Sequence, residues 1–146
     1  MKKIIPNLYE LFEGMYGSNL AKYLSGYCKN GESNEYGDIG LFLLLIPVIM
    51  SALFYFFLAD RNFYRPRQWW IFASFGCLVM LIIGASMSYN DLSNGLVCES
   101  VKYAFTDCVM FGFVNVIWAF LFFLMLSQVL QRVGKKSARY TPFSLL

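Results

Sequence analysis

The sequence predicts an all-α integral membrane protein with three transmembrane helices preceded by two short amphipathic helices. Three observations lead to this prediction. The chain has 146 residues, of which 58% are hydrophobic and only 14% are charged, whereas soluble domains average roughly 25% charged residues. Three uncharged apolar runs are long enough to cross a bilayer, which takes roughly 20 helical residues. An apolar stripe with the period of a helix precedes the first run.

Residues 1–38 are expected to form an extracytoplasmic region of two amphipathic helices and a polar linker. Apolar side chains recur there at spacings of three and four, namely Leu8, Leu11, Phe12, Met15, Tyr16, Leu20, Tyr23, Leu24 and Tyr27. Gly17 is expected to end the first helix and Ser18 to cap the second, which closes near Gly26. Because the polar face mixes acids with few lysines, packing on a partner or on the chain itself is favoured over adsorption to a membrane surface.

The three predicted spans contain no charged residue and show no polar stripe, as expected for helices surrounded by lipid. They cover residues 39–59, 69–89 and 108–130. The remaining segments are a cytoplasmic loop at 60–68, an extracytoplasmic loop at 90–107 and a basic cytoplasmic tail at 131–146.

Lys and Arg side chains near the span ends predict the orientation, because such residues concentrate on the cytoplasmic side. The first loop and the tail hold most of them: Arg61, Arg65, Arg67, Arg132, Lys135, Lys136 and Arg139. The protein is therefore expected in the plasma (inner) membrane as a multi-pass protein, with its N-terminus outside and its C-terminus in the cytoplasm. These cations are expected to fix this topology and to contact lipid headgroups.

Polar and small residues within or beside the spans are candidates for helix packing or for lining a pore. The polar ones are Asn115, inside the third span, and Asp107, at its outer boundary. Asn115 would either hydrogen-bond a neighbouring helix or face an oligomeric pore, and Asp107 would be a hydrated loop acid or part of an acidic ring. Gly76, Gly84 and Ser86 let helices approach closely in the second span. Pro47 should bend the first span, as a static feature or as a gating hinge.

Three of the four cysteines lie on the predicted outer side, where an oxidising compartment permits disulfides. These are Cys28, Cys98 and Cys108, and the favoured pairs are Cys98 with Cys108 or Cys28 with Cys98. The alternative is that all remain free thiols. No Cys-x-x-Cys pair or metal-ligand spacing occurs, so neither a metal site nor another cofactor is expected.

The chain is expected not to be an enzyme. It contains no histidine, which removes His-based acid–base chemistry and His-ligated metals, and it has no phosphate-binding glycine loop or nucleophile motif. The favoured function is a small membrane subunit that anchors or assembles a larger complex. The alternatives are a homo-oligomeric ion-permeable pore and a membrane sensor or adaptor. The expected partners are the lipid bilayer and either other membrane subunits or copies of the chain itself, without nucleic acid.

Overall fold

The computed structural model describes residues 9, 11–26, 35–58, 66–95, 97–98 and 100–133. Those residues form helices and turns without a β-strand: α2 (Glu13–Tyr16), α3 (Ser18–Leu24), α4 (Glu35–Ala52), the π-helical segment η2 (Leu53–Leu58), α5 (Pro66–Ser93) and α6 (Phe105–Val133). Three helical stretches are long and apolar enough to cross a membrane, over Tyr36–Phe56, Arg67–Ser93 and Phe105–Gln131. The predicted fold class is confirmed.

The long helices extend beyond the apolar runs. α4 begins at Glu35, inside the segment expected to be a linker, and α5 continues through Asn90 and Asp91 to Ser93. α5 begins at Pro66, where a missing N–H is tolerated because the first turn has no helical acceptor for it. The helices outlast the apolar runs because a helical backbone keeps its hydrogen bonds in water as well as in lipid.

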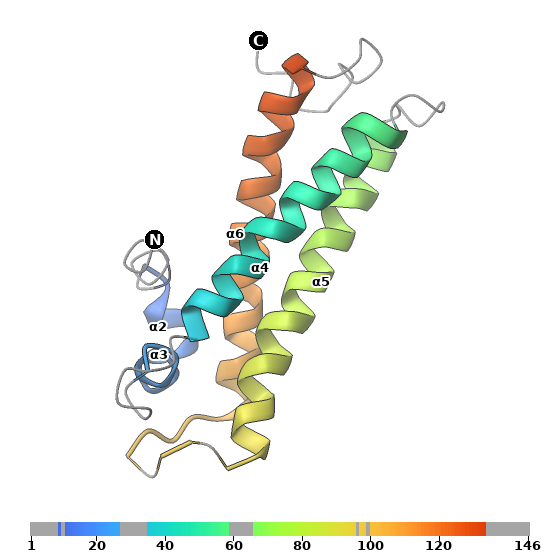
Figure 1. The fold of residues 1–146 in the computed structure, drawn as a ribbon. Coiled ribbons are helices and arrows are strands. Elements are labelled where there is room, and N and C mark those ends of the chain that lie inside the picture. Colours follow the sequence, from blue (N-terminus) through green and yellow to red (C-terminus); the bar gives the residue numbers. More distant parts are fainter. Residues whose placement is uncertain are drawn as a thin grey trace.

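The three long helices form one bundle (Figure 1). α5 and α6 lie side by side, and α4 crosses them obliquely. α2 and α3 lie beside the beginnings of α4 and α6. We call this end of the bundle, with α2, α3 and the turns at 97–98 and 100–104, the short-helix end. The end where η2 stops and α5 begins is the opposite end.

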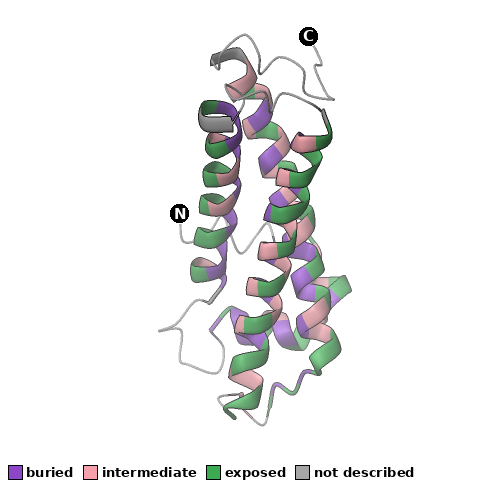
Figure 2. Cartoon of the chain, turned by 90° about the vertical axis from the view of Figure 1, so that its right-hand side faces the viewer, coloured by how far each residue is buried: buried purple, intermediate pink, exposed green. Residues whose placement is uncertain are grey.

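Each end of the bundle has its own apolar cluster. The cluster at the short-helix end joins the two short helices to the long ones through Tyr16, Leu20, Tyr36 and Phe111. The cluster at the opposite end is smaller and consists of Phe54, Tyr55, Trp69, Ala73 and Phe123. Figure 2 shows buried residues on the inward faces of the long helices and exposed residues on their outward faces, as expected for a bundle surrounded by lipid.

Part of the apolar stripe of the short helices packs on the chain's own bundle, whereas Leu11 and Met15 of the same stripe are exposed. Tyr16, Leu20 and Leu24 have no exposed surface. Gly17 separates α2 from α3 with a φ of 88°, a left-handed conformation that glycine adopts without a steric cost. The expectation that Ser18 caps the second helix is wrong. Gly17 occupies the N-cap position without a side-chain hydrogen bond, and Ser18 is the first helical residue.

Pro47 lies within α4 and does not end the helix. Its side chain is buried. Because proline has no N–H, the carbonyl of Leu43 loses its helical donor. The helix then changes to wider π-helical winding at Leu53, and Ser51 donates a side-chain hydrogen bond of 3.0 Å to the Val48 carbonyl between these two irregularities.

Candidate functional site

Asn115 is one of the fully buried polar residues of the spans. Its side chain has no exposed surface. Its Nδ2 donates to the Phe111 carbonyl at 2.9 Å, and its Oδ1 accepts a hydrogen bond from the Tyr9 hydroxyl at 2.5 Å. One hydrogen bond therefore stays within α6, and the other joins α6 to the N-terminal segment. Both polar atoms of the amide are satisfied within the chain, as a buried amide in a low dielectric requires.

Gly84 of α5 faces this amide across the contact between α5 and α6. A Cβ atom placed on Gly84 would lie 2.5 Å from Asn115 Nδ2 and 3.2 Å from its Cγ. Across the same contact, a Cβ on Gly112 would lie 3.0 Å from the Leu81 carbonyl oxygen and 3.3 Å from Ala85 Cβ. A side chain at Gly84 would force a shift and one at Gly112 would crowd α5, so the two glycines let α5 and α6 pack closely, which is the usual role of small residues between membrane helices.

Three tyrosines, Tyr9, Tyr16 and Tyr36, extend the hydrogen-bond network of Asn115 towards the short helices. The Tyr16 hydroxyl donates to the Tyr9 carbonyl at 3.0 Å and lies 3.0 Å from the Tyr36 hydroxyl. The rings of Tyr9 and Tyr36 stack with centroids 5.0 Å apart, and both contact Phe111. Burial, and secondarily the neighbouring Tyr16, raise the pKa of Tyr9 above its usual value. These hydroxyls are neutral donors and acceptors that fasten the short helices to the bundle.

The turns that precede α6 also contact the short helices. Asn19 Nδ2 donates to the Lys102 carbonyl at 2.9 Å. The rings of Tyr23 and Tyr103 are 5.5 Å apart, and the Tyr103 hydroxyl donates to the Ser88 carbonyl of α5 at 3.1 Å. The N-terminal helices, the turns and the end of α5 thus form one continuous structure at the short-helix end.

Asp107 is half-buried at the beginning of α6, and its Oδ2 accepts the Ala104 backbone N–H at 2.9 Å. The carboxylate thereby satisfies an N–H at the helix start and lies at the favourable end of the helix dipole. It also faces α2 and α3, because a Cβ on Gly17 would lie 3.9 Å from Asp107 Cγ. In this chain Asp107 acts as a helix-capping residue.

The other predicted packing residues lie apart from the Asn115 network. Gly76 is buried in α5, and a Cβ there would meet Met50 Cγ of α4 at an ordinary 3.6 Å. Ser86 is exposed and donates to the Ile83 carbonyl at 3.3 Å, within its own helix. Pro47 is buried at a different level of α4.

The polar contact at the opposite end of the bundle was not predicted from the sequence. Trp69 Nε1 donates to Ser127 Oγ at 3.1 Å, and both residues are buried between α5 and α6. Trp69 and Trp70 appear in the sequence as a pair of interfacial aromatics, but only Trp70 is exposed. The hydroxyls of Tyr9, Tyr16 and Tyr36 were also missed, although tyrosine in place of phenylalanine along a buried stripe signals a need for hydrogen bonds.

Among the predicted headgroup-contacting cations, Arg67 is exposed at the beginning of α5. Five of the others, Arg61, Arg65, Lys135, Lys136 and Arg139, lie outside the described residues, and Arg132 belongs to the last turn of α6.

Of the three described cysteines, two are free thiols and one is disulfide-bonded. Cys77 and Cys108 are free, and Cys108 is buried, so the predicted Cys98–Cys108 pair is not formed. Cys108 points back along α6, with its Sγ 3.7 Å from the Ala104 carbonyl. Cys98 is disulfide-bonded. No disulfide joins two described cysteines, and Cys28, the other predicted partner, lies outside the described residues.

Chemically, the described residues at this site offer neutral hydroxyls, an amide and one capping carboxylate. No group of three or more His, Cys, Asp or Glu side chains that would hold a metal ion occurs among them. The arrangement joins helices. No protein-family model, curated protein or solved structure matches the chain.

Proposed function

We propose that this chain is a non-enzymatic membrane subunit that anchors or assembles a larger membrane complex. The observation that carries the proposal is that the buried Asn115 amide and the buried Trp69 indole of the spans find their hydrogen-bond partners within the chain itself. Asn115 is bonded to Tyr9, and Trp69 is bonded to Ser127. The outward faces of the long helices are left almost entirely apolar, as expected of a scaffold that contacts lipid and other helices.

The length of the helices supports a surface outside the bilayer at the short-helix end. α5 has 28 residues and α6 has 29, which is about 42–44 Å at 1.5 Å per residue, against about 30 Å of hydrocarbon. We place one bilayer boundary at the first turn of α5, because Arg67 lies there. The excess length then falls at the short-helix end. The exposed Asp38, near the beginning of α4, supports the second boundary at that level.

Tyr89 and Phe105 are the best candidates for contact with a partner. Their rings are 5.3 Å apart in an edge-to-face arrangement. They remain 46% and 57% exposed at the end where the helices outlast the hydrocarbon. Exposed aromatic pairs are typical of protein interfaces. A shallow hollow along the same part of α5, lined by Ser86, Asn90 and Ser93 among others, offers hydrogen-bonding groups beside the pair.

We place the short-helix end outside the cell and the C-terminus in the cytoplasm of a plasma membrane protein, because Lys and Arg are concentrated in the first loop and the tail. The disulfide at Cys98 supports an oxidising surrounding for the short-helix end. Cys28 is the proposed partner of Cys98, because Cys77 and Cys108 are free. A membrane-impermeant amine reagent should label Lys102 in intact cells, and labelling only after lysis would contradict this orientation.

Site-specific photocrosslinking in the native host tests the subunit proposal. A photoreactive residue at Phe105 should give a discrete adduct with a foreign membrane chain. The matched controls are Leu78, exposed in the middle of α5, and Val114, buried in α6, and both should give much weaker adducts. Adducts only with the chain itself would favour the homo-oligomeric pore, and native mass spectrometry would then give the number of copies. A single copy without any adduct would contradict the subunit function and favour a sensor that acts alone.

A further inference from the structure

An apolar groove opens on the outside of the bundle near the opposite end. It has a volume of about 370 Å³ and is lined by Met50, Leu53, Ile71, Phe72 and Phe75. Each of these side chains is apolar, and the groove lies between the α4–η2 helix and α5. Ile71 and Phe75 remain 63% and 57% exposed. The groove therefore offers no side-chain hydrogen-bond partner to a polar ligand, but its walls can contact a hydrocarbon chain.

The irregular winding of the α4–η2 helix shapes one wall of the groove. Leu53 is the first residue of the π-helical segment, and it follows the Pro47 and Ser51 irregularities of α4. After Leu53 the wider turn directs Phe54 and Tyr55 into the buried cluster around Trp69. Leu53 itself is left at the rim, half exposed beside the groove. π-Helical turns of this kind are often associated with binding sites.

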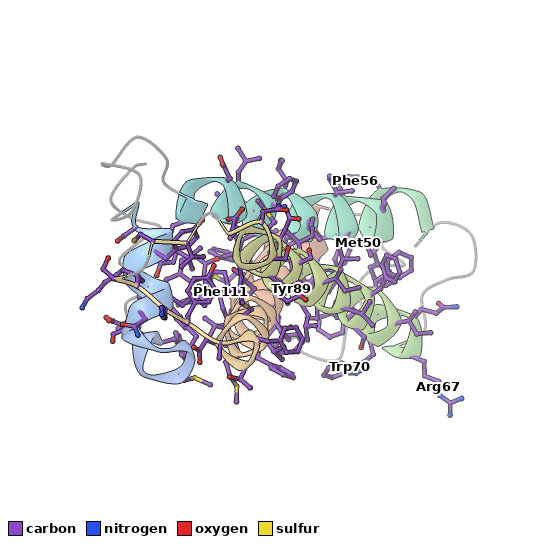
Figure 3. The ribbon with its side chains drawn as sticks, turned by 90° about the horizontal axis from the view of Figure 1, so that it is seen from below. Met50, Phe56, Arg67, Trp70, Tyr89 and Phe111 are labelled. Atoms are coloured by element: carbon purple, nitrogen blue, oxygen red, sulfur yellow. The ribbon has the colours of Figure 1, made fainter. Side chains whose placement is uncertain are left out.

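A cation lies at the headgroup end of this groove. Arg67, Ile71 and Phe75 follow one another at intervals of four along α5, so they lie along one side of the helix. Arg67 is exposed and projects from the end of the bundle (Figure 3). From Arg67 to Phe75 the helix rises about 12 Å, which places the cation at the membrane surface and the groove in the adjoining hydrocarbon. The first loop, residues 60–68, carries Arg61, Arg65 and Arg67 against Asp60.

We propose that Arg67 and this groove form a binding site for one anionic phospholipid. The headgroup phosphate accepts hydrogen bonds from the Arg67 guanidinium, which suits phosphate oxygens because it presents several N–H donors in one plane. One acyl chain lies against Ile71, Phe75 and Leu53. The positive charge of Arg67 selects an anionic lipid over a zwitterionic one, and the apolar walls select a lipid over a soluble phosphate. This site is independent of the subunit function proposed above.

Lipid titration followed by native mass spectrometry tests the site on the full chain. The protein is stripped of lipid in mild detergent and titrated separately with phosphatidylglycerol and phosphatidylcholine of the same acyl chains. We expect the first phosphatidylglycerol to bind about fivefold more tightly, since one basic side chain near a membrane surface contributes about that factor. Arg67→Gln should remove this preference. Lys102→Gln, which removes an exposed cation at the short-helix end, should keep it.

A second pair of variants separates the groove from the cation. Ile71→Ser places a hydroxyl in the apolar wall of the groove. It should weaken the binding of both lipids by a similar factor and retain the preference for phosphatidylglycerol. Leu78→Ser changes a residue of comparable exposure on the same helix that does not line the groove, and it should leave both affinities unchanged. Equal binding of the two lipids by the unaltered protein would overturn the proposal. So would a preference that survives Arg67→Gln, or equal effects of the two serine variants.

Discussion

Replacement of Gly84 by alanine tests the close contact of α5 and α6 directly. The new Cβ would lie 2.5 Å from Asn115 Nδ2, nearer than non-bonded heavy atoms approach. The Asn115 side chain is short and is held by two hydrogen bonds, to Phe111 and from Tyr9. It can move away only by losing at least one of them, or α5 and α6 must separate.

The expected cost of Gly84→Ala follows from these contacts. Overpacking of a tight contact costs about 1–3 kcal/mol, and an interhelical hydrogen bond in a membrane contributes about 0.6–1.7 kcal/mol. Alanine recovers up to about 1 kcal/mol through its higher helix propensity. We therefore expect the free energy of unfolding to fall by about 2 kcal/mol. Equilibrium unfolding in mixed dodecyl maltoside and SDS micelles, followed by tryptophan fluorescence, measures this change.

Two further variants test whether the contact with Asn115 causes the loss of stability in Gly84→Ala. Gly76→Ala is the matched control on the same helix, because its Cβ would meet Met50 Cγ at an ordinary 3.6 Å; it should leave the free energy of unfolding unchanged or raise it by up to about 1 kcal/mol through helix propensity. In a Gly84→Ala, Asn115→Ala double variant, the nearest remaining atom is Gly112 Cα at 3.4 Å. The double variant should lose at least about 1 kcal/mol less than the sum of the single ones. If Gly84→Ala is as mild as Gly76→Ala, or if the two changes are additive, the reasoning is refuted.

Three other predictions concern Ser127, Tyr9 and the disulfide of Cys98. Ser127→Ala leaves the buried Trp69 indole N–H without its acceptor and should destabilise the protein by about 1 kcal/mol in the same unfolding assay; an unchanged midpoint would contradict this role. Because burial raises the pKa of Tyr9 above its usual value of 10.0, its contribution is complete below pH 10 and is lost as the pH rises further. Tyr9→Phe should therefore reduce the loss of stability measured between about pH 9 and pH 11, and an identical slope would show that Tyr9 is not responsible. Finally, with Cys28 bonded to Cys98, the unfolded protein should present two reactive thiols before reduction and all four cysteines after it; equal counts would exclude the disulfide.

The spans could be predicted from the sequence because a helix surrounded by lipid must be apolar on nearly all sides. A run without charge and without a polar stripe has few alternatives to a membrane helix. The ends of these helices were less predictable, because Asn90 and Asp91 interrupt the apolar run of α5 without interrupting its backbone hydrogen bonds. Hydropathy describes the surroundings of a helix, whereas the end of a helix depends on capping and turn geometry.

The candidate site was predictable only in part. The position of Asn115 within an apolar run predicted that it needs a hydrogen-bond partner, and its two proposed roles were helix packing and pore lining. Its partner, Tyr9, is 106 positions away in the chain, and no local pattern connects the two. Likewise, the spacing of Trp69 and Trp70 does not reveal which of the two faces Ser127, because that depends on the rotation of α5 against α6.

The long separation between Tyr9 and Asn115 has a consequence for the biogenesis of the protein. Chains are made from the N-terminus, and early segments begin to fold before later ones exist. The short helices emerge before the three long ones, but α2 packs mainly on α6, which is made after α4 and α5. Until then the buried side chains Tyr16, Leu20 and Leu24 have no complete packing surface. The short helices thus reach their final place only after α6 is inserted, and an incompletely inserted chain displays these side chains to the machinery that recognises unassembled membrane proteins.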